Sequence, residues 1–409
     1  STVDEELGQS MMLQVCRDIV GNTICADFLD YLYRDWHHLG KPLYQDKRLY
    51  QYMEVRQPAG DNAINASRFV INVGPSDKIR HDALTDILEL LNARYKLAAT
   101  VLFHRTKLAL TGLLDRCLLE IADLYRAAGF EKSYFDETAE RLLLEGSDDS
   151  VPVILRELAA GGSSDGKMKL DALLKQERQK VQAAAVATSR DPGPLLAGTQ
   201  EDDDEVESVS GRLQTQSNLV NRLIDRLRDR EVYALAYKLR ISDLPGEHSP
   251  NNPHVQKLIR LYRQPRKRLE FLQNVEILCE LPAGSLSMYC PYDATMNAKV
   301  AKVNLYVEGE VRPFDDYETA HGGASLTRGA LTAQVARFYE LWSVQIYVER
   351  TCWGAMSQDI QGHLKAVLRA FFFQINHGYG LDVVRTQIDS SIAIVRAGRQ
   401  AARGGSPEP

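Results

Sequence analysis

Apolar residues recur every three or four positions through most of the first 160 residues, which is the period of an amphipathic helix. The spacing predicts helices over residues 5–21, 24–40, 80–128, 137–144 and 151–160. The longest of these contains no proline, and we expect it to bend or break once near residue 98. Residues 43–56 predict a short helix and a strand, and residues 68–73 predict a strand that stops at Gly74-Pro75.

The second half of the chain mixes helical and strand patterns. Helices are predicted at 219–237, 253–262, 266–273, 331–340 and 358–373, and strands at 275–281, 286–290, 303–307 and 344–348. Between the halves, residues 161–216 are poor in apolar residues and carry an acidic block at 201–207, which predicts an exposed, partly disordered insertion.

These patterns predict a mainly α fold with a smaller C-terminal α+β region. The predicted organisation is a helical domain over 1–160, the insertion over 161–216, a helical continuation over 217–273, an α+β region over 274–396 and a disordered tail over 397–409.

Composition narrows the class of protein. With 44% hydrophobic and 25% charged residues, the chain resembles ordinary soluble globular proteins. A net charge of -6 gives no global basic surface for nucleic acid, although a local cluster at 263–268 would suit either phosphate contacts or, the favoured interpretation, a solvated turn. Nucleic acid therefore stays open as a partner.

Cysteine usage and hydropathy predict the compartment. The six cysteines are scattered without a CxxC pair, which suits a reducing cytoplasm and argues against structural zinc. No run of eighteen apolar residues is present, so we expect a cytoplasmic protein without a membrane partner. The chain opens on Ser1 with a helical pattern close behind, and we expect that further sequence precedes it in the natural gene product.

The segment Ile24–Gly40 has the most distinctive chemistry. It holds three aspartates, one arginine and two histidines, and helical spacing puts Asp27, Tyr31 and Arg34/Asp35 on one face. Asp30 and Arg34 are four residues apart and can form an ion pair. These residue types are those that hold metals and phosphates, rather than the lysine-rich mixture of a solvated face.

Other motifs are weaker. The pair His81-Asp82 follows a turn at a helix start, where an aspartate is ordinary capping chemistry. His37 and His38 are adjacent and point to different faces, which favours a structural role. Arg94 and His104/Arg105 are about three helical turns apart and would share a face, suiting either a polyanionic ligand or surface ion pairs.

Taken together, these residues resemble a known family. The run Asp27-x-x-Asp30-Tyr-x-x-Arg34-Asp35 is similar to the DxxDYxxRD segment of HD-domain deoxynucleoside triphosphate triphosphohydrolases, in the branch of the animal SAM- and HD-domain enzyme and its bacterial relatives. Arg94-Tyr-x-Leu and His104-Arg-Thr resemble the second signature of that family. The resemblance covers roughly residues 10–160 and 215–350 and implies an HD-like helical bundle.

The resemblance implies a metal-dependent hydrolysis of nucleotides. A divalent ion (Mn, Mg, Fe or Zn) would be held by an H…HD…D set whose last member is Asp27, and it would activate a water for attack on phosphate. Tyr31 and Asp35 would line the nucleoside pocket, Arg94 would act on phosphate as the catalytic cation, and Arg34 would pair with Asp30. His104 and Arg105 join the substrate-binding residues through the second signature.

Several positions differ from the family pattern. No histidine precedes His37, so the H…HD segment is expected upstream of this chain or on a companion subunit. Phe28 stands where the family usually has a basic residue, and Ala98 and Leu102 stand in place of aromatic or histidine side chains that contact the sugar.

Two functions follow from this mixture. The first is a nucleotide phosphohydrolase, (d)NTP triphosphohydrolysis above all, that needs the upstream segment for a complete site. The alternative is an HD-fold scaffold with impaired catalysis, or a nucleotide- or nucleic-acid-binding subunit of an assembly. A modified nucleotide or an oligonucleotide end is a further substrate that a widened pocket would admit. The family also implies a homo- or hetero-oligomer.

Overall fold

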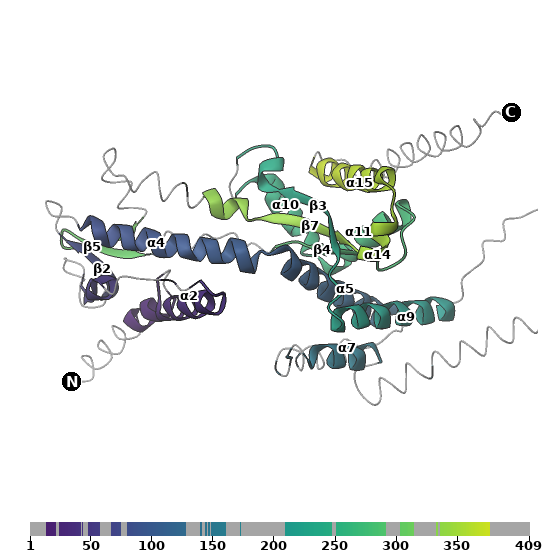
Figure 1. Ribbon diagram of the computed structural model, residues 1–409, viewed down its shortest axis with the longest axis horizontal. Coiled ribbons are helices and arrows are strands. Elements are labelled where there is room, and N and C mark those ends of the chain that lie inside the picture. Colours follow the sequence, from purple (N-terminus) through teal and green to yellow (C-terminus); the bar gives the residue numbers. More distant parts are fainter. Residues whose placement is uncertain are drawn as a thin grey trace, which may run out of the picture. The chain divides into compact units, whose positions relative to one another are not determined.

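Two units make up the computed structural model of the chain, shown in Figure 1. The described residues are 14–21, 24–41, 43, 48–57, 67–74, 80–127, 149–160, 209–247, 251–291, 303–314 and 336–376, with single positions at 140, 144, 146, 147, 172 and 333. Unit 1 comprises Ser1–His104, Arg240–Gln256 and Pro291–Ser343, and unit 2 comprises Arg105–Leu239, Lys257–Cys290 and Val344–Pro409. The predicted segment 1–160 is therefore divided after His104.

The described residues are mainly helical and include two small sheets, as the predicted class requires. In unit 1 a four-stranded sheet has the order β1-β2-β5-β6. Its strands are β1 (Met53–Arg56), β2 (Arg68–Gly74), β5 (Asn304–Val307) and β6 (Glu310–Pro313). The outer pairs are antiparallel and the central pair, β2 with β5, is parallel.

That parallel pair joins two predicted strands that the predicted organisation assigned to different regions, the helical domain over 1–160 and the α+β region over 274–396. Ile71 of β2 is in register with Leu305 of β5, so the sheet joins segments from opposite ends of the chain. Because parallel strands need a long crossover connection, no turn motif in the local sequence can predict this pairing.

Helices of unit 1 pack on this sheet around one apolar core. They are α2 (Ala26–His38), α3 (Arg48–Gln51) and α4 (His81–Leu97). The core takes Phe28 and Leu32 from α2, Ile87 and Leu91 from α4, and Leu305 from β5, each at most 2% exposed. The predicted helix at 24–40, the short helix and strand at 43–56 and the strand at 68–73 are thus confirmed.

The predicted break in the long helix is also confirmed. After α4, residues Ala98–Leu102 form a π-turn, and α5 (Arg105–Ala127) follows. The Phe103 amide donates to the Ala98 carbonyl at 2.9 Å, a wider loop than the i→i−4 bond of an α-helix. The inserted turn shifts the helical phase between α4 and α5.

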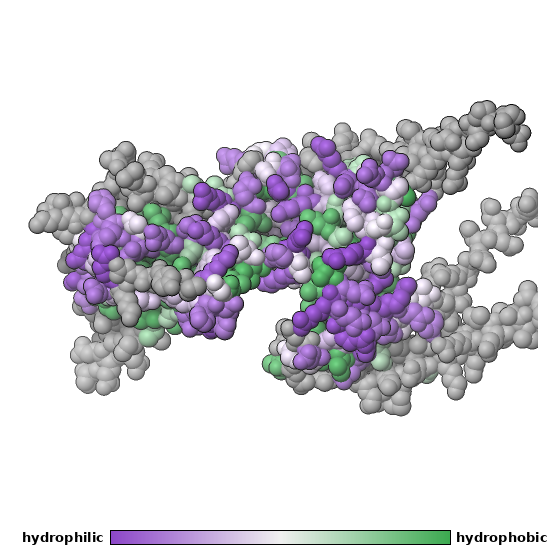
Figure 2. Space-filling model, viewed as in Figure 1, coloured by the Kyte–Doolittle hydropathy of each residue, from purple (hydrophilic) through white to green (hydrophobic). Residues whose placement is uncertain are grey.

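Unit 2 combines helices with a three-stranded sheet of order β3-β7-β4. Its strands are β3 (Ala234–Arg240), β4 (Leu286–Tyr289) and the fully buried central β7 (Ser343–Val348). Besides α5, its helices are α7 (Val151–Ala159), α9 (Val209–Arg228), α11 (Pro265–Leu278), α14 (Arg350–Ala355) and α15 (Gln358–Asn376). The 3-10 turn Ile241–Asp243 lies in unit 1, and α10 (Pro253–Tyr262) runs from unit 1 into unit 2. Figure 2 shows a hydrophilic surface over α9.

Helix α5 approaches β4 closely because Gly112 has no side chain. A Cβ atom at this position would lie 3.2 Å from the backbone carbonyl carbon and oxygen of Met288. The glycine within the helical pattern therefore serves packing, because the two backbones lie too close for a residue that has a side chain.

A buried arginine ties α5 to α11 and β4. The Arg116 side chain is 0% exposed and donates to Glu120 at 2.9 Å and to both carboxylate oxygens of Glu276 at 3.1 and 3.0 Å. It also donates to the Leu286 carbonyl at 3.0 Å, while the Leu286 amide donates to Glu276 at 2.8 Å. Each charge in this group is paired, as a buried charge requires.

Two helix ends were predicted wrongly, and both have the same cause. Helix α9 ends at Arg228 rather than near 237, and α11 continues to Leu278 where a strand was expected at 275–281. Arg230 and Glu280 adopt positive φ values of 53° and 54°. Glu231 donates to the Arg226 carbonyl and Leu281 to the Glu276 carbonyl, the 6→1 bond of a Schellman end.

Such ends usually carry glycine at the left-handed position, and neither site has one. A sequence pattern that searches for glycine therefore misses them.

Helix α9 also begins at Val209, inside the segment 161–216 predicted as an insertion. Most of the rest of that segment, the predicted helix at 137–144 apart from two single positions, and the tail 397–409 lie outside the described residues.

Candidate functional site

Four of the seven candidate residues gather where α2 packs against α4 in unit 1. These four residues, Asp27, Tyr31, Asp35 and Arg94, are called the corner below. Phe28 is 2% exposed and packs against the corner. The Arg94 guanidinium carbon lies 5.4 Å from the centre of the Phe28 ring, and the Tyr31 ring meets Phe28 edge-on at 5.7 Å. Asp27 and Asp35 act electrostatically on the Tyr31 phenol, as does Arg94.

Helical spacing on α2 produces this arrangement. Phe28 and Leu32 are four residues apart and form the buried stripe that faces the core. Asp27, Tyr31 and Asp35 follow the same period on the neighbouring stripe, so they run along the edge of the core. The expectation that these three share a face agrees with this geometry.

Helix α2 begins at an unusual cap. The Cys25 sulfur accepts from the Phe28 amide at 3.4 Å, where serine or aspartate would be common. At the other end Gly40 has a φ of 67°, and the Leu39 amide donates to the Asp35 carbonyl at 3.0 Å. The helix is fixed at both ends, which fixes the position of the residues between them.

Burial controls the protonation of Tyr31. It raises the pKa of the phenol above its usual value, Arg94 opposes this change, and Cys25, Asp27 and Asp35 add to it. The phenol is therefore neutral at physiological pH and can donate a hydrogen bond.

Arg94 holds a charge that the described residues leave without a carboxylate partner. Its side chain is half-buried, and within the described part of the chain its contacts are the Phe28 face and the electrostatic influence on Tyr31. A guanidinium stacked on an aromatic ring keeps its N–H groups at the ring edge, where they can bind an anion.

Arg34 is exposed and lies close to two aspartates of the same helix. Its guanidinium lies 2.7 Å from Asp30 and 3.7 Å from Asp35, with 55% of the side chain exposed. The predicted pairing with Asp30 is confirmed. An exposed pair of this kind adds little stability, so its contribution is to orient the side chain.

His104 and Arg105 are both exposed and lie on either side of the boundary between the units. Their predicted shared face with Arg94 requires an uninterrupted helical period. The π-turn at Ala98–Leu102 and the break at Phe103–His104 interrupt the period between them.

The two histidine motifs agree with the structural interpretations. Asp82 accepts a hydrogen bond from the Tyr52 hydroxyl at 2.8 Å, and this bond lowers the pKa of the carboxyl. Arg80 lies over the Tyr52 ring at 4.9 Å. His37 and His38 are exposed, with their rings edge-on to each other.

The basic cluster at 263–268 is not a solvated turn alone. Arg266 and Lys267 both pair with Glu270, at 2.8 and 3.3 Å. Arg268 is buried and pairs with Asp115 at 3.0 Å. Arg266 and Lys267 are thus on the surface of α11, while Arg268 belongs to the interior of unit 2.

Asp27 is exposed and supplies one carboxylate. Within the described ranges, no three histidine, cysteine or acidic side chains come together as a metal site. The described residues therefore do not by themselves fit the implied ion, and no reaction step is derived through it. The resemblance places the remaining ligands upstream of Asp27.

No protein-family model and no curated protein matches the chain. The sequence resemblance and the geometry of the corner are therefore what bear on function. Among the helices that are described, none has the length and apolar character needed to cross a bilayer.

Sequence reasoning missed one residue of the site. The sequence identified Phe28 only as the replacement of a basic residue, yet Arg94 lies over its ring and Tyr31 contacts it. The available signal was its place in the apolar stripe with Leu32, three residues before Tyr31, which puts an aromatic side chain between the core and the polar edge.

Proposed function

We propose that this chain provides the nucleotide-binding part of a metal-dependent phosphohydrolase, with (d)NTP triphosphohydrolysis as its reaction. One observation carries the proposal: the Arg94 guanidinium lies over Phe28, and Arg94 acts electrostatically on the Tyr31 phenol together with the two carboxylates that the resemblance assigns to metal and sugar. An arginine without a carboxylate partner among the described residues suits the charge of a phosphate group.

Each residue of the corner has a role in this proposal. Arg94 binds phosphate oxygens through the edge of its guanidinium. The neutral Tyr31 phenol and the Asp35 carboxylate hold sugar hydroxyls as donor and acceptor. Asp27 is a metal ligand together with residues outside the described part of the chain, and a divalent ion bound there would supply an activated water.

The remaining candidates have supporting roles. Arg34 stays a substrate-binding prediction, with its position fixed by Asp30. His104 and Arg105 are exposed and stay predictions of contacts with the substrate. Phe28 provides an apolar platform where the family has a further cation, so Arg94 carries more of the phosphate binding in this chain.

Turnover in the full gene product tests this proposal, because the resemblance implies metal ligands upstream of Asp27. The assay follows triphosphate release from dNTPs with manganese. Asp27→Asn is expected to reduce the rate more than about 100-fold, since loss of a direct ligand should exceed the effect of a residue that merely orients one.

Glu89→Gln is the matched control, since it removes an exposed carboxylate from α4 of the same unit. We expect it to leave the rate within about threefold, because Glu89 has no role in the proposed site. Equal rates in the wild type and Asp27→Asn would contradict the mechanism.

A non-catalytic scaffold is the second candidate, and the two apolar replacements favour it. Ala98 is buried at 4% exposure and Leu102 is 42% exposed, where the family has side chains that contact the sugar. A scaffold would bind a nucleotide through Arg94 and release no triphosphate in the same assay. Binding that survives without turnover, in the full gene product with manganese, would select this candidate.

A further inference from the structure

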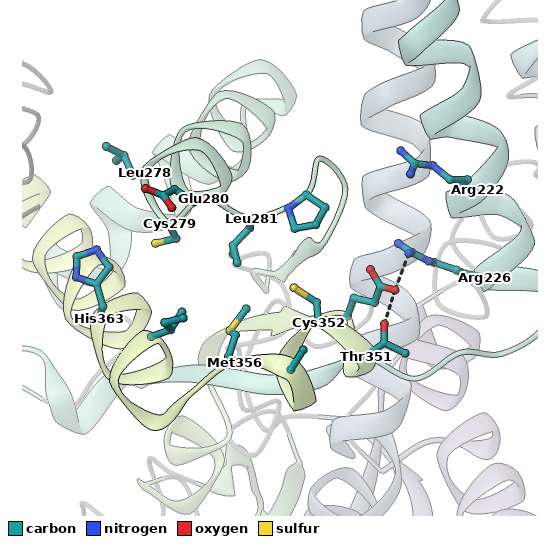
Figure 3. A pocket seen from close by; sticks show the side chains of 14 residues that line it. Arg222, Arg226, Leu278, Cys279, Glu280, Leu281, Thr351, Cys352, Met356 and His363 are labelled. Carbon is teal, nitrogen blue, oxygen red and sulfur yellow. Dashed lines mark hydrogen bonds and ion pairs between the residues drawn. The ribbon is translucent and has the colours of Figure 1, made fainter. Parts of the chain in front are cut away.

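A separate cavity lies within unit 2 and is lined by none of the candidate nucleotide-binding residues. It has a volume of about 650 Å³, in the range of small-molecule sites. Figure 3 shows its walls: one face of α9, the end of α11 with the loop that follows, and helices α14 and α15. Every residue that lines it lies inside unit 2.

One wall of the cavity is cationic. Arg222 and Arg226 are four residues apart on α9, so they project from the same helix face toward the opening in Figure 3. Arg226 is bound at 2.6 Å to Glu349 and at 3.1 Å to the Tyr233 hydroxyl. Arg222 is exposed and makes no ion pair within the described part of the chain.

The charge of Arg226 is therefore offset inside the protein, and the charge of Arg222 is available for a ligand. This difference limits the site to about one negative charge on its occupant. A second anionic group placed near Glu349 or Glu280, which also line the cavity, would be repelled.

The wall opposite α9 carries apolar side chains beside Glu280 and His363. It includes Leu281, Met356 and Ile360, together with two thiols. Burial raises the pKa of the Cys279 thiol to about 12 and also raises that of Cys352, so both are neutral at physiological pH. Neutral thiols behave as small apolar groups in a wall of this kind.

We propose that this cavity binds a small amphiphile that has one acidic head group. The head group binds Arg222, and the apolar body packs on Leu281, Met356 and Ile360. This inference is independent of the proposed nucleotide activity, because it uses residues of the other unit.

Calorimetric titration of the full chain with decanoate tests it. Decan-1-ol is the neutral counterpart, and decanedioate carries a charge at both ends. We expect decanoate to bind at least about tenfold more tightly than either, because only it offers one charge to Arg222 and an apolar end to the opposite wall.

Four variants locate the site. Arg222→Ala should weaken decanoate binding about tenfold or more, and Arg222→Lys should keep most of the affinity. Arg228→Ala is the matched control, since it removes an exposed arginine from the same helix outside the cavity, and it should change nothing. Ile360→Glu tests the apolar wall without removing a fully buried side chain and should abolish binding.

Three results would overturn the proposal. They are no decanoate binding by the wild type, binding that is equal in Arg222→Ala and Arg228→Ala, and binding of decan-1-ol as tight as that of decanoate. Circular dichroism of each variant confirms that a lost signal comes from a folded protein.

Discussion

Arg94 and Arg116 lie on successive helices of one long helical stretch, yet their charges have opposite surroundings. Arg116 in unit 2 is 0% exposed and bonded to two carboxylates and a carbonyl. Arg94 in unit 1 is half-buried on an aromatic ring, without a carboxylate partner among the described residues. A charge whose hydrogen bonds are all used inside the protein serves structure, whereas a partly open charge can bind a ligand.

The buried group should give the largest effect. Arg116→Ala leaves Glu120 and Glu276 buried without their counter-charge, so we expect a loss of about 3–5 kcal/mol in the free energy of unfolding. Denaturant titration measures it. The double variant Arg116→Met with Glu276→Gln removes charge from both sides and should recover part of the loss. A loss below about 1 kcal/mol for Arg116→Ala would remove the contrast with Arg94.

Asp115, the neighbour of Arg116, provides a test by pH. Burial raises the pKa of its carboxyl to about 6, although Arg268 and Arg116 oppose the change. A raised pKa means that the folded state holds the proton more tightly, so stability falls as the pH rises from about 4 to about 6. The full shift corresponds to at most about 3 kcal/mol.

The measurement is the free energy of unfolding across this pH range in the wild type and in Asp115→Asn. The variant lacks the titrating group and should show a flatter profile. Identical slopes in both proteins would show that Asp115 is ordinarily solvated and that the interior around Arg116 is less dry than the contacts indicate.

Two glycines, one in each unit, allow a comparison in which the expected stability losses are smaller. Gly40 in unit 1 and Gly284 in unit 2 both have positive φ, of 67° and 78°. A Cβ at Gly40 meets nothing within 4 Å, whereas one at Gly284 would lie 2.5 Å from the Leu219 side chain. We expect Gly40→Ala to cost about 1 kcal/mol from the backbone alone and Gly284→Ala to cost about 1 kcal/mol more. Thermal unfolding that ranks them in the reverse order would contradict this packing.

Much of the candidate corner could be predicted from the sequence. A period of 3.6 residues places Asp27, Tyr31 and Asp35 in line, and no long-range information is needed for that. A bend or break near residue 98 was also predicted, and the π-turn Ala98–Leu102 lies there. That Arg94 lies close to these three residues could be predicted only from the family resemblance.

What could not be predicted depends on contacts distant in sequence or on rare backbone geometry. Arg116 meets Glu276 from another helix far along the chain, and a local pattern cannot show such a partner. Arg230 and Glu280 end helices in a left-handed conformation without being glycine. Tertiary packing determines these positions, so propensity alone places the ends wrongly.

One comparison tests the central claim most directly: nucleotide binding and unfolding free energy measured together for Arg94→Ala in the full gene product. Since the contribution of the Arg94 side chain to the fold among the described residues is a cation–π contact, we predict a stability loss below about 1 kcal/mol. Loss of a charged contact to phosphate should weaken nucleotide binding about tenfold or more. Unchanged binding in a stable Arg94→Ala protein, or a stability loss as large as that of Arg116→Ala, would contradict the account.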